Sequence, residues 1–184
     1  MALSFSEYIS GSLEALAAAK GAEATAVAIV RDLKRVIAQG GTIYACGNGG
    51  SACDSMHFVE ELVARYEKTR PGIRAQHFLD PGTLTCWAND VDFVSVFRRQ
   101  VETFVTNKDA LIVLTTSGNS KNILEALKAG MERGACCIAF LGKNGGAARG
   151  LATHDLLINS PKTSFIQQAH MTVLHYICEQ LEAD

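Results

Sequence analysis

The chain has 184 residues, of which 48% are hydrophobic and 20% charged, and its formal net charge is −2. This size and composition predict one globular domain, and the interspersed charges exclude the basic stripe that is typical of nucleic-acid-binding proteins. No apolar run approaches the roughly 20 residues of a membrane span, and the first ten residues lack the pattern of a signal peptide. Six cysteines without a C-x-x-C pair favour reduced thiols. We therefore expect a soluble, cytoplasmic protein that binds neither nucleic acid nor membranes.

Two amphipathic helical patterns come first in the chain, at residues 5–19 and 23–39, and the pair Gly40-Gly41 ends the second. Short apolar runs then alternate with helical patterns. Strands are expected at residues 42–46, 73–78, 110–115, 136–141 and 155–158. Helices are expected at residues 51–64, 81–88, 91–106, 120–133, 145–152 and 165–181. This alternation predicts an α/β fold with a doubly wound, five-stranded parallel sheet between two helix layers. We expect a single domain over residues 1–184, with residues 1–39 as helices for oligomer packing and 40–184 as the binding core.

The first expected strand ends in a glycine-rich loop, Cys46-Gly47-Asn48-Gly49-Gly50-Ser51. Glycines let the backbone approach a ligand closely, and the following helix offers free N–H groups to an anion. A tight turn with Ser51 as helix cap explains the same pattern. The spacing Gly47-x-Gly49-x-x-Ala52, with Asp80 after the next strand, also satisfies a relaxed dinucleotide motif. This loop alone leaves all three interpretations open.

A second loop after an expected strand is rich in hydroxyl groups, Thr115-Thr116-Ser117-Gly118-Asn119-Ser120. An ordinary serine cap needs only one of the four hydroxyls, whereas four of them beside a helix N-terminus can surround a phosphate. In a parallel sheet both loops lie at the carboxyl ends of strands, where ligands bind. The pair therefore predicts a site for a phosphorylated small molecule. No lysine follows the first loop, which disfavours triphosphate hydrolysis.

Two expected helices carry polar side chains at helical spacing. His57 and Glu61 are four residues apart, which is typical of a solvated surface pair but also of half a zinc site. The last helix carries Gln167, His170 and His175 on a largely apolar background. Gln167 and His175 are eight residues apart, about 12 Å of helical rise, so a shared metal would require their side chains to converge.

The residues from about 40 to the C-terminus resemble the bacterial phosphoheptose isomerases, enzymes with a sugar-isomerase (SIS) domain. The resemblance lies in the segments 46–51, 54–62, 65–66, 70–71, 88–90, 97–102, 116–120, 142–146 and 166–175. It implies a SIS-type, flavodoxin-like fold and a homotetramer with shared sites. It also implies an aldose–ketose isomerase that converts sedoheptulose 7-phosphate to D-glycero-D-manno-heptose 7-phosphate, the first step toward ADP- or GDP-heptose for lipopolysaccharide or another surface polysaccharide.

The resemblance also implies residue roles. Glu61 and His175 match the acid/base residues, and zinc is the implied metal, with no nucleotide cofactor. The implied zinc ligands are His57, Glu61, Gln167 and His175. The implied substrate-binding residues are Asn48, Gly49, Gly50, Glu61, Asn89, Asp90, Thr115, Thr116, Ser117, Ser120 and Gln167. Isomerisation moves a proton between adjacent carbons through an enediolate, so a carboxylate base and a histidine that serves the oxygens suit this chemistry.

This chain departs from the family pattern at a few positions. Phe165 and Gln168 replace an arginine and a glutamate, and Trp87 and Asp80 stand in an unusual segment. These departures leave open an isomerase of another ketose phosphate. A non-catalytic SIS protein that binds the bacterial replication initiator is a further alternative, which the retained acid/base residues disfavour. The dinucleotide interpretation ranks below both, because it assigns no role to the second loop.

Overall fold

The computed structural model describes residues 2–183; Met1 and Asp184, which the single-domain prediction includes, lie outside the described residues. Five strands form one sheet in the order β2-β1-β3-β4-β5, and every neighbouring pair is parallel. The strands are β1 (Ile43–Gly47), β2 (Ala75–His77), β3 (Ala110–Thr115), β4 (Cys136–Gly142) and β5 (His154–Ile158). The predicted fold class is confirmed.

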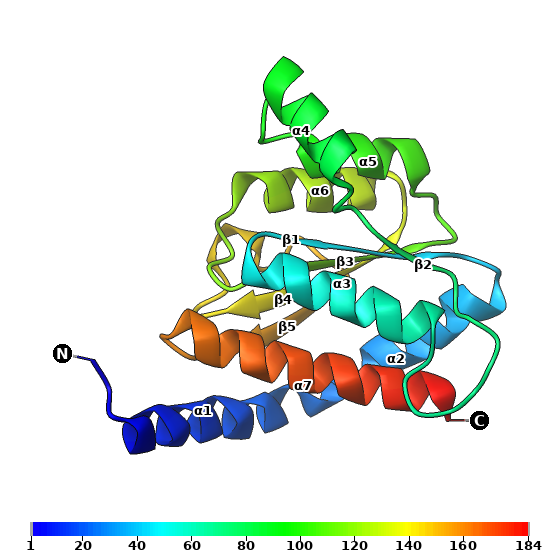
Figure 1. Cartoon of the computed structure of the whole chain (residues 1–184). Helices are drawn as coiled ribbons and strands as arrows, with labels where there is room; N and C mark the ends of the chain where they lie inside the picture. The colour runs from blue at the N-terminus through cyan, green and yellow to red at the C-terminus, as the bar shows by residue number, and fades with distance from the viewer. Residues whose placement is uncertain (1, 184) are drawn as a thin grey trace.

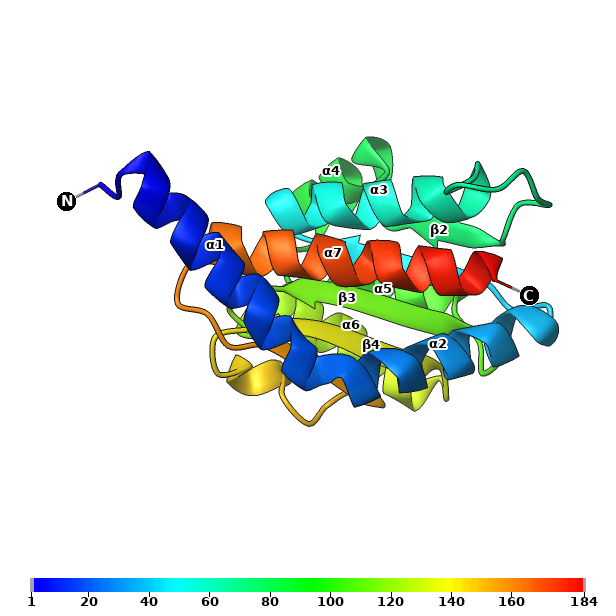
Figure 2. The same ribbon diagram turned by 90° about the horizontal axis from the view of Figure 1, so that it is seen from below.

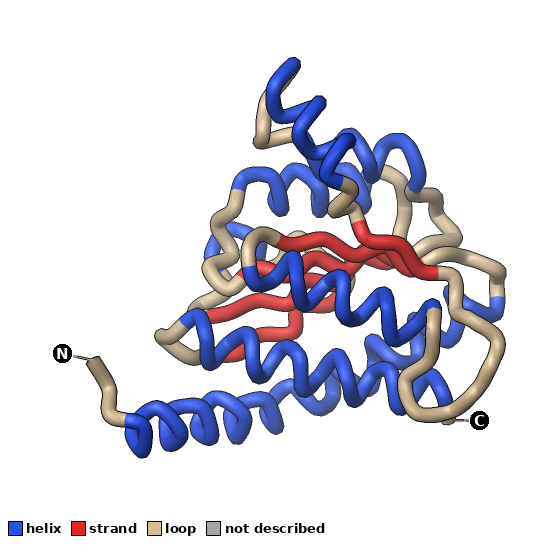
Figure 3. Tube along the Cα trace, in the orientation of Figure 1, coloured by secondary structure: helices blue, strands red, loops and turns tan. Residues whose placement is uncertain are grey.

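Helices cover both faces of the sheet (Figure 1, Figure 3). One face carries α1 (Phe5–Ala19), α2 (Glu23–Ala38), α3 (Gly50–Val63) and α7 (Thr163–Glu182), which Figure 2 shows together. The other face carries α5 (Val96–Phe104) and α6 (Lys121–Glu132), while α4 (Pro81–Asp90) stands out beyond α5. Successive strand residues point to opposite faces, so Ile112 belongs to the core under α3 and α7 and Val113 to the core under α5 and α6.

The structure corrects three expected elements. Residues 145–152 form no α-helix but only the 3₁₀ turn η2 (Gly146–Ala148), because Gly145, Gly146 and Gly150 have the positive φ angles of left-handed backbone. The helix expected at 91–106 begins only at Val96, after a turn in which the Asp92 carboxylate accepts from the Ser95 N–H at 2.6 Å. Strand β2 spans three residues instead of six.

The chain's N-terminal helices differ in how they meet the rest of the molecule. Helix α2 buries Ile29 and Leu33 in the core under α3 and α7. Helix α1 lies along α7, where Tyr8 packs edge-on against Phe165, but it leaves Phe5, Ile9 and Leu13 exposed. Among residues 2–183 no helix combines the length and apolar character needed to cross a membrane.

Candidate functional site

The two predicted loops lie beside each other because β1 and β3 are neighbours in the sheet. Strand β2 lies on the other side of β1 and β4 on the other side of β3, so the chain order reverses at this point. Such a switch point is where open α/β sheets bind their ligands. A cavity of about 300 Å³ opens there, lined by Asn48, Gly50, Ser51, Leu114, Thr115, Thr116, Ser117, Ser120, Thr163 and Gln167.

Some side chains of the hydroxyl-rich loop form hydrogen bonds within the loop, and Ser120 does not. The hydroxyl of Thr115 accepts from the Gly118 N–H, and that of Ser117 accepts from the Asn119 N–H, both at 3.2 Å. Ser120 occupies the N-cap position of α6, yet its side chain makes no capping hydrogen bond. Ser120 lines the cavity at a helix N-terminus, which favours anions. Capping alone therefore does not explain Ser120.

Position 118 requires glycine. Its φ is +65°, and a Cβ atom there would collide with the carbonyl of Gly145 in the loop after β4. That neighbouring loop supports the hydroxyl-rich loop through hydrogen bonds from the Ala148 N–H to the Gly118 carbonyl at 2.9 Å and from the Ala147 N–H to Asn119 Oδ1 at 3.0 Å. The backbone N–H groups around the cavity are thus held in place before any ligand binds.

The glycine-rich loop is tied to the second loop through Asn48. Its side-chain amide exchanges two hydrogen bonds of 2.9 Å with the amide of Asn122, a buried residue in the first turn of α6. At the start of α3, Gly50 lets the amide of Gln167 approach, because a Cβ atom at Gly50 would overlap that amide. The cavity is therefore closed on one side by α7.

Three of the predicted catalytic and metal-binding side chains meet between α3 and α7. His57 Nε2 lies 3.0 Å from Glu61 Oε1, and the rings of His57 and His175 are 5.2 Å apart. Donor atoms of these three residues all lie within 4.8 Å of one another. The ring of Tyr66 stacks on His175 at 5.7 Å. A carboxylate and two imidazoles at this spacing can transfer protons or hold a divalent cation.

Comparisons with known proteins show the family of this chain. The model of the SIS domain matches residues 5–142. The phosphoheptose isomerase of Laribacter hongkongensis is 45% identical over 146 residues, which cover 77% of this chain and 74% of the relative. The chain belongs to the phosphoheptose isomerase family.

Solved structures extend the agreement to the three-dimensional fold. The phosphoheptose isomerase GmhA from Neisseria gonorrhoeae superposes with a TM-score of 0.89 at 31% identity, covering 96% of both chains. A phosphoheptose isomerase from Francisella tularensis gives a TM-score of 0.92 at 28% identity, covering 96% of this chain and 95% of that one.

In this phosphoheptose isomerase site, Gln167 is separated from the other predicted zinc ligands along the axis of α3. Its amide lies against Gly50, whereas His57 follows Gly50 by seven residues, about 10 Å of helical rise. Two imidazoles and a carboxylate form the ligand set of many catalytic zinc sites, so His57, Glu61 and His175 fit the predicted metal without a fourth protein ligand. The part of Gln167 as a ligand stays a prediction.

Asn89 and Asp90 do not line the cavity. They end the protruding helix α4, where both are exposed and the Asn89 amide donates to Asp90 Oδ1 at 2.7 Å. Asp80, the acid of the dinucleotide interpretation, is the N-cap of α4 and accepts from the Thr83 N–H at 2.7 Å. Its carboxylate therefore has a structural role at that helix.

The structure also shows residues to which the sequence interpretation assigned no role. Asn122 joins the two loops, and Arg70 donates at 2.8 Å to each of the carbonyls of Glu61 and Leu62 at the end of α3. Asp54 precedes His57 by one helical turn; burial raises its pKa to about 6, and the nearby His57 opposes that rise. The only local sign of a role for Asn122 is its position in the first turn of α6, directly after the hydroxyl-rich loop. Nothing local indicates the contacts of Arg70.

Two of the four expected departures from the family pattern, Phe165 and Gln168, lie at the contact between α1 and α7. Gln168 accepts from the Ser12 hydroxyl at 2.5 Å, and Phe165 packs against Tyr8. Lys162 lies over the Phe165 ring, 4.7 Å from its centroid. Trp87 is separate and donates to the Ser95 hydroxyl at 2.8 Å. Phe165 and Gln168 therefore attach the first helix to the last one.

Proposed function

We propose that this protein interconverts sedoheptulose 7-phosphate and D-glycero-D-manno-heptose 7-phosphate, with the phosphate on the hydroxyl-rich loop and the reacting carbons at Glu61 and His175. The observation that carries this proposal is the separation of the two groups along α3. A neutral cavity suited to phosphate lies at the start of the helix, and the acid/base cluster lies two to three turns further on. An open-chain heptose 7-phosphate likewise carries its phosphate and its reacting carbons at opposite ends.

Glu61 is the proposed base. Its carboxylate takes the proton from C1 of the ketose and returns it to C2, so that an enediolate connects the two sugars. His175 gives a proton to the carbonyl oxygen and takes it back from the neighbouring hydroxyl. Stacking on Tyr66 and contact with His57 hold the imidazole in place for this exchange. The side chain of Glu61 is only 15% exposed, which limits competition from water.

Zinc remains the proposed metal, held by His57, Glu61 and His175, and when bound it would polarise the substrate oxygens. A carboxylate that binds a metal is a weaker base, so the two roles proposed for Glu61 compete. Metal analysis of protein purified without chelator, followed by chelation and assay, tests this part. Full activity after complete removal of zinc would contradict it.

We further propose a homotetramer in the cytoplasm. Exposed apolar side chains on α1, Phe5 and Leu13 among them, support a second chain at that helix. Val91 and Phe93, at the end of the protruding α4, support a contact that carries Asn89 and Asp90 toward a neighbouring site. All six cysteines are free thiols, which supports a reducing compartment. Light scattering on the purified protein measures the oligomeric state.

The activity is tested with sedoheptulose 7-phosphate and a panel of other ketose phosphates. We expect Glu61→Gln and His175→Gln each to lower turnover by about a hundredfold or more, since each removes an acid/base group, while calorimetry still detects substrate binding. Glu60→Gln is the matched control, because Glu60 is the exposed neighbour of Glu61 on α3. Turnover near the wild-type value in either active-site variant would reject these assignments.

The same panel separates the alternatives. A preference for another ketose phosphate with the same response to Glu61→Gln would leave the chemistry intact and change only the substrate. Absence of turnover with every sugar would favour a non-catalytic SIS protein. In that case a pull-down with the bacterial replication initiator would be the next measurement.

A further inference from the structure

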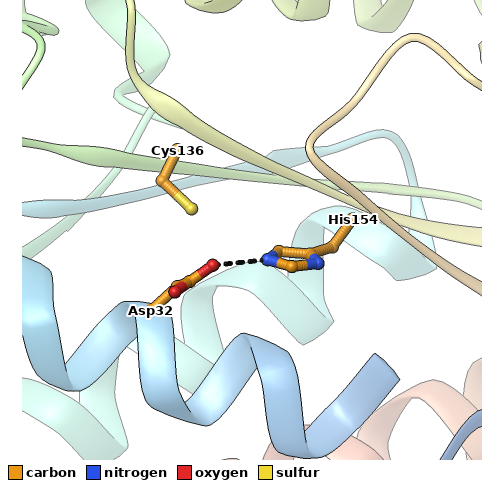
Figure 4. A group of neighbouring side chains, drawn as sticks. All are labelled: Asp32, Cys136 and His154. Atoms are coloured by element: carbon orange, nitrogen blue, oxygen red, sulfur yellow. Dashed lines mark hydrogen bonds and ion pairs between the residues drawn. The ribbon is translucent and has the colours of Figure 1, made fainter. Parts of the chain in front are cut away.

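Three side chains with metal-binding atoms meet far from the sugar-phosphate cavity. Cys136 begins β4, His154 begins β5, and Asp32 faces both from the middle of α2. Figure 4 shows the sulfur, the imidazole and the carboxylate directed toward one another, and their donor atoms all lie within 4.8 Å of one another. These residues are at the amino ends of the strands, whereas the cavity lies at the carboxyl ends. The proposed isomerisation assigns them no role.

We propose that Asp32, Cys136 and His154 form a second cation site, specific for a borderline-soft divalent ion such as Zn²⁺. Thiolate, imidazole and carboxylate are the three ligand types that zinc takes in proteins. The sulfur ligand disfavours magnesium and calcium, which bind oxygen. Only the proposed active-site cluster among the described residues offers a comparable group, and it has no sulfur.

The geometry needs only a small adjustment to receive the ion. Asp32 Oδ2 and His154 Nε2 are 2.7 Å apart as a hydrogen-bonded pair. Ligands on one tetrahedral zinc lie roughly 3.5 Å apart for bonds of about 2.0–2.3 Å, so the pair must open by somewhat under 1 Å. The ion then replaces the hydrogen bond, and the Cys136 thiol releases its proton as it becomes a ligand.

Neighbouring side chains hold the Asp32 carboxylate in a fixed orientation. Its side chain is 6% exposed, and its Oδ1 atom lies 3.2 Å from Arg31 Nε and 3.4 Å from Arg35. The arginines contact one carboxylate oxygen, and the other oxygen faces His154. The arginines also repel a cation, which sets a limit on affinity.

A second cavity adjoins the cluster at Cys136. Cys136 lines this cavity of about 230 Å³ together with Arg35 and Thr153 among others. A water molecule from this cavity can supply the fourth ligand. With the ion bound, α2 would be joined to β4 and β5, so the site would fasten the N-terminal helices to the sheet. A ligand that binds only the folded state stabilises it.

Cobalt(II) is the most direct probe, since a cobalt–thiolate bond gives an ultraviolet charge-transfer absorption that nitrogen and oxygen ligands do not give. We expect metal-free full-length protein to develop this absorption on titration with Co²⁺ and to lose it on addition of Zn²⁺. Cys136→Ser and Cys136→Ala should abolish the absorption. His154→Gln should weaken cobalt binding by at least the roughly tenfold that follows loss of a partner of a metal ligand.

Cys178→Ser is the matched control, because Cys178 is a buried thiol on α7 close to Glu61 of the other cluster. It should keep the absorption. Zinc should also raise the melting temperature of the wild type more than that of Cys136→Ala, and circular dichroism checks that each variant is folded. The proposal is overturned if saturating cobalt gives the wild type no thiolate band, or if the band survives in Cys136→Ser.

Discussion

Arg70 and Glu182 form an ion pair of 3.0 Å that joins the ends of the two helices carrying the proposed catalytic residues. The guanidinium of Arg70 also donates to the last carbonyls of α3, while the Glu182 carboxylate, on the final turn of α7, accepts from the N–H groups of Tyr66, Glu67 and Lys68. The loop that leaves α3 is thereby folded back onto α7. Glu61 belongs to α3 and His175 to α7. The Arg70–Glu182 ion pair therefore maintains the distance between the two proposed catalytic residues.

Replacing Glu182 with glutamine should therefore loosen this end of the site. The variant keeps the shape but loses the charge that Arg70 and three N–H groups share, and we expect the free energy of unfolding to fall by about 1–3 kcal/mol. Turnover should fall as well, because Glu61 and His175 are then less firmly positioned. Chemical denaturation and the isomerase assay measure the two effects. Glu179→Gln, an exposed glutamate on the same helix, should change neither quantity.

Glu182 also makes stability depend on pH in the acid range. Burial acts to raise its pKa, but the backbone N–H groups and Arg70 outweigh it and lower the pKa from 4.5 to about 2. A lowered pKa means that the folded state holds the proton more weakly than the unfolded state. The stabilisation is therefore complete above pH 4.5 and is lost as the pH falls toward 2. Between pH 4.5 and 2, the free energy of unfolding, measured by denaturation at each pH, should change less with pH for Glu182→Gln than for the wild type. The same pH dependence in both proteins would contradict the assignment.

A substitution at Ser120 should change substrate binding without changing the stability of the fold. Because Ser120 lines the cavity and its hydroxyl makes no capping hydrogen bond, Ser120→Ala should leave stability nearly unchanged. Loss of one hydrogen bond to a charged phosphate, worth about 1.5–3 kcal/mol, should raise the KM roughly tenfold to a hundredfold. Ser4→Ala is the opposite control: Ser4 caps α1 in a capping box, so its loss should reduce stability and leave the KM unchanged. An unchanged KM for Ser120→Ala would exclude it from phosphate binding.

Gly118 should tolerate no side chain. Gly118→Ala places a methyl group against the Gly145 carbonyl on left-handed backbone, so the hydroxyl-rich loop must shift. We expect phosphate binding, measured by calorimetry, to weaken severely, with a smaller loss of stability. Gly21→Ala tests whether loss of any glycine has this effect, since nothing lies within 4 Å of a Cβ atom there. Normal binding by Gly118→Ala would show that the loop is adaptable.

The local pattern of the chain was enough to predict most of the secondary structure and both ligand loops. Apolar runs such as residues 110–115 form buried strands, and Ser117 and Ser120 line the cavity as the hydroxyl pattern indicated. The chief error, the helix expected at 145–152, came from apolar spacing that glycines with positive φ override. Backbone conformation at such positions depends on the neighbouring loops, which the local pattern does not contain.

By itself the sequence determined the α/β alternation, the two loops at strand ends and the pairing of His57 with Glu61, because each depends on residues close together in the chain. Only the tertiary structure decided which distant residues meet. It placed His175 beside that pair, Glu182 on Arg70, and Asp32 between Cys136 and His154. Contacts across a hundred residues depend on strand order and helix packing, and these emerge only when the apolar faces of helices such as α2, α3, α6 and α7 are buried against one sheet.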